Sequence, residues 1–368
     1  MEPSEIAVTT APALPNIVEL ERPALEAALE ARGHGRFRAR QIFRWIYRRG
    51  VTDLAAMTDL PRELRELGKE LSLTTPQLVH REKSIDGTEK FLLQLSDSRQ
   101  VESVFIPDTP AMTFCISTQV GCAMACAFCL TGKMGLARNL TAGEIVGQVR
   151  VLAGVLGMRD TSFNIVLMGM GEPLHNYDET MKALRILTDE RGFAMPPRRM
   201  TLSTVGLLPA LERLAEEPVM PNLAISLHAP TDRQRGELVP INKKYGVSDI
   251  IAACKRFPLK KRGRITFEYV LLAGVNDAPE DARRLARLLA GVKSKINLIP
   301  LNAAAGIPFE RPSDEAIGRF AGILAERHLI VSVRKSRGRD IRAACGQLIV
   351  EGQRRSPAQQ LATLAFGD

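Results

Sequence analysis

The stretch from Cys115 to Cys129, CISTQVGCAMACAFC, holds four of the six cysteines in the chain. Cys122, Cys126 and Cys129 have the spacing C-x-x-x-C-x-x-C, so a single loop can place three thiolates around one inorganic cluster. A cubane 4Fe-4S cluster contains four irons, and three cysteines leave one of them without a protein ligand. The spacing therefore predicts a 4Fe-4S cluster with one iron open to another molecule.

Two other uses of these cysteines are open at this point. A zinc site usually takes four Cys or His ligands in paired knuckles, and here the fourth ligand would have to come from a distant part of the chain. Disulfides form in oxidising compartments, and the N-terminus MEPSEIAVTT lacks the basic and apolar segments of a secretory signal. The cluster is the stronger interpretation.

Phe128 directly precedes the last cysteine, and with it the loop resembles the signature of radical S-adenosylmethionine (SAM) enzymes. In that superfamily the open iron binds the amino and carboxylate groups of SAM. The resemblance implies that SAM is a second cofactor of this chain.

A rhythm of strands and helices after Met112 indicates an α/β fold that positions this loop. The pattern predicts six strand–helix units. A closed barrel of this kind takes eight, so the expected architecture is a partial (β/α)6 barrel with an open side. The predicted strands are residues 112–118, 163–168, 198–203, 222–226, 265–271 and 295–299. The predicted helices include residues 141–157, 176–190, 207–217 and 279–290.

Polar residues and glycines follow the C-terminal ends of these strands, where chemistry collects in such folds. Gly169 and Gly171 let the backbone approach a ligand closely, and Glu172 can pair with a cationic amine such as the SAM amino group. Side chains at other strand ends offer donors and acceptors for ribose, carboxylate or adenine edges. The predicted cofactor-binding residues are Gly171, Glu172, Ser203, Ser226, Leu227, His228 and Asn302.

Cys345 lies in the stretch IVSVRKSRGRDIRAACGQL, after a strand predicted over residues 330–335. Basic residues surround it in sequence, and nearby cations favour the nucleophilic thiolate form of a cysteine. Taken alone, a cysteine beside two alanines is more often a small buried side chain. Cys254 lies within a helical pattern and is interpreted as a core residue.

Before the barrel, three helical patterns are followed by short strands, with Asp86-Gly87 as a strong hairpin signal. Glu102 is a carboxylate in the otherwise apolar strand QVESVFIP and, taken alone, would be an edge residue. The predicted parts are a mobile arm (1–18), a helical module (19–75), a small β linker (76–110), the barrel core (111–346) and a C-terminal tail (347–368).

The helical module carries seven arginines within eighteen residues and no acid among them. Such a run is commonly a solvated helix surface. Seven charges exceed what solubility needs, so we favour contacts with phosphates. The arginines are Arg32, Arg36, Arg38, Arg40, Arg44, Arg48 and Arg49, and residues 260–264 form a second basic patch.

The composition is that of a globular protein without a membrane span. Hydrophobic residues make up 45% of the chain, and no apolar run is long enough to cross a bilayer, so we expect a cytoplasmic protein. The net charge of +9 is compatible with a polyanionic partner. Aromatic residues make up only 5%, which disfavours a broad platform for stacking single-stranded bases.

The motifs CISTQVGCAMACAFC, GMGEPL, STVG, SLHAP, PLN and RGRDIRAACGQL, in this order, closely resemble those of the radical SAM methyltransferases that act on carbon C2 of adenine in bacterial ribosomal and transfer RNA. The resemblance covers nearly all of the chain after the N-terminal arm. It implies 23S rRNA, before or during ribosome assembly, and tRNA as partners, with the target adenine turned out of its stack into the barrel. It also implies a one-electron donor such as flavodoxin, and neither DNA nor a membrane as partner.

The resemblance assigns roles to three further residues. One SAM would methylate Cys345, and a second SAM would yield a 5′-deoxyadenosyl radical that removes hydrogen from that methyl group. The carbon radical would add to C2, and Cys115 would resolve the resulting crosslink by forming a disulfide with Cys345. Glu102 would accept the C2 proton. Two SAM molecules would be consumed per methylation.

Three alternatives remain at the level of sequence. A related branch methylates carbon C8 of the same rRNA adenine with nearly the same residues. A radical SAM activase of a partner protein would not need Cys345. A zinc-stabilised RNA-binding protein would hold zinc instead of iron.

Overall fold

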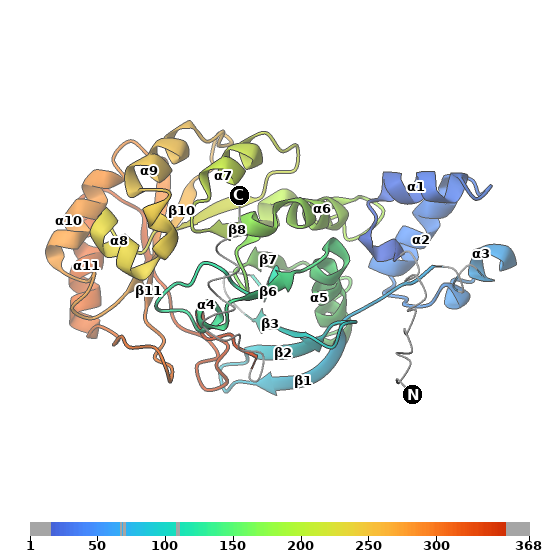
Figure 1. Ribbon diagram of the computed structural model, residues 1–368, viewed down its shortest axis with the longest axis horizontal. Coiled ribbons are helices and arrows are strands. Elements are labelled where there is room, and N and C mark those ends of the chain that lie inside the picture. Colours follow the sequence, from blue (N-terminus) through green and yellow to red (C-terminus); the bar gives the residue numbers. More distant parts are fainter. Residues whose placement is uncertain (1–15, 67, 69–70, 108–110, 351–368) are drawn as a thin grey trace, which may run out of the picture.

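The computed structural model describes residues 16–66, 68, 71–107 and 111–350. Within them, ten strands form one sheet that curls into an incomplete barrel, and a small helical module stands to one side (Figure 1). The strand order is β1-β2-β3-β4-β7-β8-β9-β10-β11-β12. Residues 1–15 of the predicted arm and residues 351–368 of the predicted tail lie outside the described residues.

The barrel consists of seven parallel strands, which include the six predicted ones and the strand predicted near residue 330. Strands such as β10, ITFEYVL, are buried on both faces, as the strands of a parallel sheet covered by helices are. The partial α/β barrel is thus confirmed. The strands are β4 (Thr113–Cys115), β7 (Asn164–Leu167), β8 (Met200–Thr204), β9 (Asn222–Ser226), β10 (Ile265–Leu271), β11 (Ser294–Pro300) and β12 (Val331–Val333).

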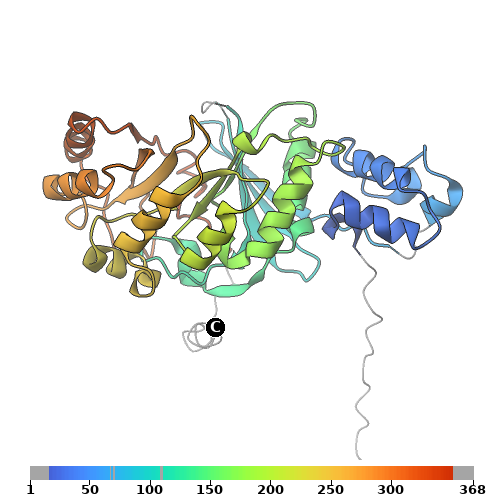
Figure 2. The same ribbon diagram turned by 90° about the horizontal axis from the view of Figure 1, so that it is seen from above.

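Helices cover the outer face of the curved sheet (Figure 2). The first long one begins at Ala142 and is capped by Thr141, whose side chain forms a reciprocal capping box with Glu144. No helix in the described part of the chain has the length and apolar character that crossing a lipid bilayer requires. The helices are α4 (Leu130–Met134), α5 (Ala142–Val155), α6 (Tyr177–Thr188), α7 (Leu208–Ala215), α8 (Asp232–Leu238), α9 (Val247–Arg256), α10 (Pro279–Leu288) and α11 (Asp314–Glu326).

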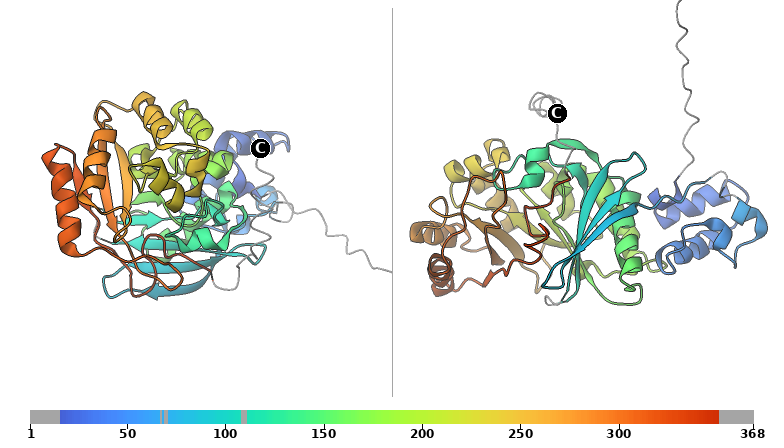
Figure 3. Two further views of the ribbon diagram at one scale, coloured as in Figure 1. Left: turned by 60° about the vertical axis from the view of Figure 1, so that its left-hand side comes forward. Right: turned by 90° about the horizontal axis from the view of Figure 1, so that it is seen from below.

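Three antiparallel strands extend the barrel sheet beyond β4. They are β1 (Gln77–Lys83), β2 (Glu89–Gln94) and β3 (Gln100–Ile106), and β3 pairs with β4. The hairpin predicted at Asp86-Gly87 is present, and Gly87 has the positive φ of 83° that such a turn requires. The C-terminal segment passes beside these strands (Figure 3).

The helical module contains α1 (Arg22–Glu30), α2 (Phe37–Tyr47) and the short α3 (Arg62–Glu66). Its apolar face is buried. The module contacts the barrel through the loop after α6, because Arg22 pairs with Asp189 at 2.8 Å and Arg48 donates a hydrogen bond to the carbonyl of Gly192 at 3.0 Å.

Candidate active site

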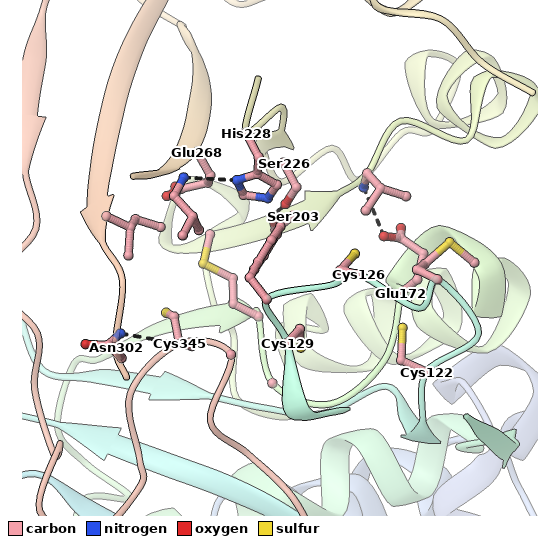
Figure 4. Close-up of a pocket in the computed structure, with 18 of the residues that line it drawn as sticks. Cys122, Cys126, Cys129, Glu172, Ser203, Ser226, His228, Glu268, Asn302 and Cys345 are labelled. Carbon is pink, nitrogen blue, oxygen red and sulfur yellow. Dashed lines mark hydrogen bonds between the residues drawn. The ribbon is translucent and has the colours of Figure 1, made fainter. Parts of the chain in front are cut away.

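A pocket opens inside the barrel at the C-terminal ends of the strands (Figure 4). Most of the residues predicted for cluster and cofactor binding line it. They are Cys122, Cys126, Cys129, Gly171, Glu172, Ser203, Ser226, His228 and Asn302, together with Cys345. Residues from distant parts of the chain therefore meet in one cavity.

The cysteine loop is held by backbone hydrogen bonds from two sides. The Ala127 N–H donates to the carbonyl of Leu238 at 2.9 Å, and the Leu130 N–H donates to the carbonyl of Gly346 at 2.8 Å. A short hairpin that the sequence did not predict, β5 (Gln119–Gly121) with β6 (Leu136–Asn139), closes the base of the loop. These contacts fix the path of the loop along the pocket.

The three thiols suit a multi-iron cluster better than a single ion. Burial raises the pKa of the thiols of Cys122, Cys126 and Cys129, so each needs a positive partner to become a thiolate. Among the described residues, no three Cys, His, Asp or Glu side chains converge closely enough to hold one metal ion. A cubane binds each thiolate through a different iron, and such convergence is not required.

Glu172 is fixed at the end of β7 with its carboxylate in the pocket. Its two oxygens accept backbone hydrogen bonds from Leu174 at 3.1 Å and Val205 at 3.0 Å. Burial nevertheless raises the pKa of this carboxyl to about 7. A cationic amine beside it would restore the charged form. Gly171 before it has φ of 103° and lies so close to Gln119 that a Cβ atom would be 2.6 Å from the Gln119 Cβ.

Three polar side chains face the same cavity from β8, β9 and the end of β11. The hydroxyl oxygens of Ser203 and Ser226 lie 3.2 Å apart, so they can together hold one polar group of a ligand. The Oδ1 atom of Asn302 is buried, and the described residues provide it with no hydrogen-bond partner. A buried acceptor of this kind is expected to pair with a ligand donor.

His228 follows β9 in the left-handed region, with φ of 62°. Its Nδ1 accepts the N–H of Val270 at 3.1 Å, and its ring packs against Phe128 at a centroid distance of 4.7 Å. Burial lowers the pKa of His228 to about 3, so the ring is neutral. With Nδ1 as acceptor, the proton is assigned to Nε2, which leaves a donor for the pocket.

Cys345 lies in an irregular loop at the rim of the pocket, where the Asn302 side chain donates a hydrogen bond to its carbonyl at 3.4 Å. The thiol lies near the guanidinium of Arg334. Cys345 and, to a smaller extent, Glu268 raise the pKa of Arg334, while burial opposes them. Burial, together with Cys345, raises the pKa of Cys115 on β4 to about 12. Cys115 therefore lies close to Cys345, although Cys115 is not among the pocket residues.

Glu102 lies on β3 outside this pocket, with its side chain only 6% exposed. It accepts the N–H of Ile349 at 2.8 Å and pairs with Lys90 at 3.1 Å. It is therefore not the edge residue that its strand alone indicated. Leu227 is fully buried in the core, and its side chain is not among the pocket residues.

Sequence reasoning gave no role to Glu268 or Arg235, and it placed Arg334 only among the basic residues near Cys345, yet all three lie around the pocket. Glu268 and Arg334 line it from β10 and the end of β12. Arg235 on α8 is fully buried, and its guanidinium donates hydrogen bonds to the carbonyls of Val205, Ser226 and Leu227. Only Glu268 carried a usable signal, because it is a carboxylate within the apolar run ITFEYVL.

Acidic side chains neutralise part of the positive charge of the arginine run in the helical module. The sequence had indicated seven arginines without acidic partners. Arg36 pairs with Glu30 at 2.7 Å and Arg40 pairs with Glu26 at 3.6 Å, because the preceding helix α1 supplies acids across the helix pair. Six of the seven arginines remain exposed, and Arg38 is half-buried. Three of them, with Arg191, line a groove between α2 and the loop after α6: Arg40, Arg44 and Arg48.

Comparison with known proteins decides the family. Residues 116–287 match the model of the radical SAM superfamily, and residues 15–72 match that of a ribosomal RNA large subunit methyltransferase N-terminal domain. A dual-specificity RNA methyltransferase RlmN of Anaeromyxobacter dehalogenans is 47% identical over 361 residues, which cover 96% of each chain. The RlmN of Geobacter sulfurreducens is 51% identical and covers 88% of this chain and 89% of its own. The chain belongs to the RlmN family.

A solved structure agrees with this membership. The crystal structure of a radical SAM methyltransferase from Sphaerobacter thermophilus has a TM-score of 0.87 and 48% sequence identity, and the match covers 91% of this chain and 99% of that one. As an RlmN-family protein, the chain is a radical SAM methyltransferase that uses a 4Fe-4S cluster and SAM. The expected family, enzyme class and cofactors are confirmed.

Proposed function

We propose that this protein methylates carbon C2 of a specific adenine in 23S rRNA and of an adenine in a subset of tRNAs. The observation that carries the proposal is the meeting of three cluster cysteines and Cys345 in one pocket. A radical enzyme that transferred no methyl group would not need the fourth cysteine at this rim. The dual-specificity RNA methyltransferases to which the chain is 47–51% identical support RNA as substrate.

The pocket fits the cluster and SAM. Cys122, Cys126 and Cys129 would hold three irons of the cluster. When bound, the cluster supplies the electron that opens a carbon–sulfur bond of SAM. Glu172 would pair with the SAM amino group, which offsets the cost of burying its carboxylate. The Asn302 Oδ1 atom would accept a ligand hydrogen bond.

Other side chains would orient SAM. The hydroxyls of Ser203 and Ser226 suit the ribose, since they are near enough to act on adjacent hydroxyl groups. The neutral His228 offers its Nε2 donor, and the close packing of Gly171 against Gln119 holds the backbone that carries Glu172. Together these contacts would hold the reactive carbon in one position, and positioning of this kind accounts for much of the acceleration in such sites.

Cys345 would carry the methyl group to the adenine, with the guanidinium of Arg334 close to its sulfur. Adenine C2 lies between two ring nitrogens and is too electron-poor to attack SAM, which is why a carrier is required. Cys115 would release the product by forming a disulfide with Cys345. Glu102 would take the C2 proton.

The helical module of residues 19–75 would recognise the RNA outside the barrel. The groove of Arg40, Arg44, Arg48 and Arg191 suits a phosphate backbone, because these four arginines outnumber the two acids that also line it, Asp59 and Glu190. A one-electron donor such as reduced flavodoxin, in the cytoplasm, completes the proposal.

The test is an anaerobic reaction of the reconstituted protein with protein-free rRNA and tRNA and with SAM labelled in its methyl group. We expect 2-methyladenosine in nuclease digests and label on Cys345 in the protein. A product of 8-methyladenosine would assign the protein to the C8 branch. A Cys345→Ala variant with full RNA methylation would overturn the carrier role.

A further inference from the structure

Four titratable side chains form a continuous line from Glu102 to solvent. Lys90 Nζ lies 3.1 Å from Glu102 Oε1 and 3.1 Å from Glu82 Oε2, and Glu82 Oε1 lies 3.5 Å from His80 Nε2. Side-chain exposure rises along the line, from 6% for Glu102 through 14% for Lys90 and 38% for Glu82 to 60% for His80. Acids and bases alternate at every step.

Strand pairing explains why these side chains meet. Glu82 on β1 lies opposite Lys90 on β2, Lys90 lies opposite Val104 on β3, and Val104 lies opposite Cys115 on β4. Paired residues share a face, and so do alternate residues of one strand. Glu82, Lys90 and Glu102 therefore lie on the same face of the sheet as Cys115.

We propose that Lys90 and Glu82 form the exit path by which the proton taken up by Glu102 leaves the buried site, with Lys90 also keeping Glu102 ionised between turnovers. The proposal rests on the proposed function of Glu102 as acceptor of the C2 proton. It adds two residues, neither of which is given a role by the motifs of the chain.

The proton leaves Glu102 through a concerted shift of two protons. After reaction Glu102 is a carboxylic acid, Lys90 an ammonium and Glu82 a carboxylate. The ammonium of Lys90 passes one proton to Glu82 while it accepts the proton of Glu102. Glu82 then releases a proton to water or to His80, so one proton reaches solvent and every group of the path regains its charge.

The surroundings of Glu102 make such a path necessary. Burial holds the pKa of Glu102 above its usual value, while Lys90 and the N–H of Ile349 oppose that effect. A buried carboxyl retains its proton unless a base lies within hydrogen-bond reach. Burial also acts on Glu82, but Lys90 and His80 outweigh it and lower the pKa of Glu82, so this carboxylate is ionised at rest and readily releases a transferred proton to solvent.

Two substitutions separate the exit path from a simple charge effect. Lys90→Arg keeps the positive charge beside Glu102 but gives a group that does not release protons in proteins. Glu82→Gln leaves the Lys90–Glu102 pair intact and removes the next acceptor. For both variants we expect one RNA methylation per enzyme at the wild-type rate, followed by turnover at least tenfold slower. Wild-type steady-state turnover in both variants would overturn the exit path.

Lys90→Met tests the second part of the proposal without RNA. Infrared difference spectra against a Glu102→Gln variant report the ionisation of Glu102 in the reconstituted protein. We expect a carboxylate in the wild type and a protonated carboxyl in Lys90→Met, with the RNA–protein crosslink accumulating when RNA is added. An ionised Glu102 in Lys90→Met would contradict the role of Lys90.

The matched control is Lys83→Met, which removes an exposed lysine of the same hairpin that pairs with Glu89 at 4.0 Å and lies outside the path. It should behave as the wild type. Steady-state turnover as slow in the control as in the path variants would mean that the hairpin is damaged and would refute the assignment. Methylation of Cys345 and formation of 5′-deoxyadenosine, measured in every protein, report the proposed function separately from the exit path.

Discussion

Asp86 and Gly338 are 252 residues apart in sequence, yet the Gly338 N–H donates a hydrogen bond of 2.9 Å to Asp86 Oδ2. A reciprocal contact lies beside it, because Asp340 accepts hydrogen bonds from the hydroxyl of Ser84 and the N–H of Ile85. The turn of the β1–β2 hairpin therefore anchors the loop that carries Cys345.

Replacement of Asp86 by asparagine should loosen this loop. Burial opposes ionisation, but the N–H groups of Gly338 and Thr88 outweigh it and lower the pKa of Asp86 to about 2. The pKa of Asp86 in the folded protein lies below the ordinary value of 3.8. The contribution of its carboxylate to the free energy of unfolding is therefore complete above pH 3.8 and disappears as the pH falls toward 2. We expect faster amide hydrogen exchange over residues 336–346 in Asp86→Asn at neutral pH. Asp277→Asn, which alters a comparable contact to Gly274, should leave that region unchanged.

Cys126→Ala should abolish the cluster, whereas Cys254→Ala should retain it. Cys126 is one of the three cysteines assigned to the cluster in the pocket, while Cys254 is buried in α9 in the barrel core. Iron and sulfide analysis after anaerobic reconstitution measures the difference. Removal of the Cys254 sulfur should cost about 1 kcal/mol of unfolding free energy through a small cavity. A Cys126→Ala protein with a full complement of iron would argue against the ligand assignment.

Arg235→Met should destabilise the fold by about 3 kcal/mol, because it leaves buried carbonyl groups at the ends of β8 and β9 without donors. Urea unfolding followed by circular dichroism measures this loss. Arg233→Met, on the same helix with a side chain 82% exposed, should change the unfolding free energy by less than about 0.5 kcal/mol. Equal effects of the two substitutions would show that the buried network does not matter.

Replacing Arg44 and Arg191 together by glutamine should weaken RNA binding and flatten its dependence on salt. Each lost phosphate contact reduces the slope of log K against log salt by about 0.7 to 0.9. Filter binding at several salt concentrations measures the slope. Lys293→Gln, just before β11, a strand on the side of the barrel away from the helical module (Figure 1), serves as control. An unchanged slope in the double variant would exclude this groove from the RNA interface.

Much of the barrel and its pocket could be predicted from the sequence because parallel strands carry their signal locally. A buried apolar run such as ITFEYVL is recognisable without knowledge of its neighbours, and the strand ends then fall at one edge. The three cluster cysteines could be assigned for the same reason, since their spacing within one loop is visible in the chain.

Contacts between distant segments could not be predicted in this way. Arg235 on α8 reads as part of an ordinary charged helix, DRQRGEL, and only the fold buries it beneath two strands. Lys90 and Glu82 read as solvent-facing residues of a hairpin, and their alignment with Glu102 depends on the register of three strands. The ion pairs of Arg36 and Arg40 likewise require the packing of α1 against α2.

The sulfur atoms of Cys115 and Cys345, which would form the proposed disulfide, are held by different kinds of backbone structure. Cys115 belongs to a strand hydrogen-bonded on both sides, between β3 and β7, whereas Cys345 lies in a stretch with neither helix nor strand. In any reaction between them, Cys115 on the strand would stay in place and the loop that carries Cys345 would move. Cys345, the proposed methyl carrier, must therefore be the residue that moves. The hydrogen bonds between its loop and the hairpin turn limit the extent of that movement.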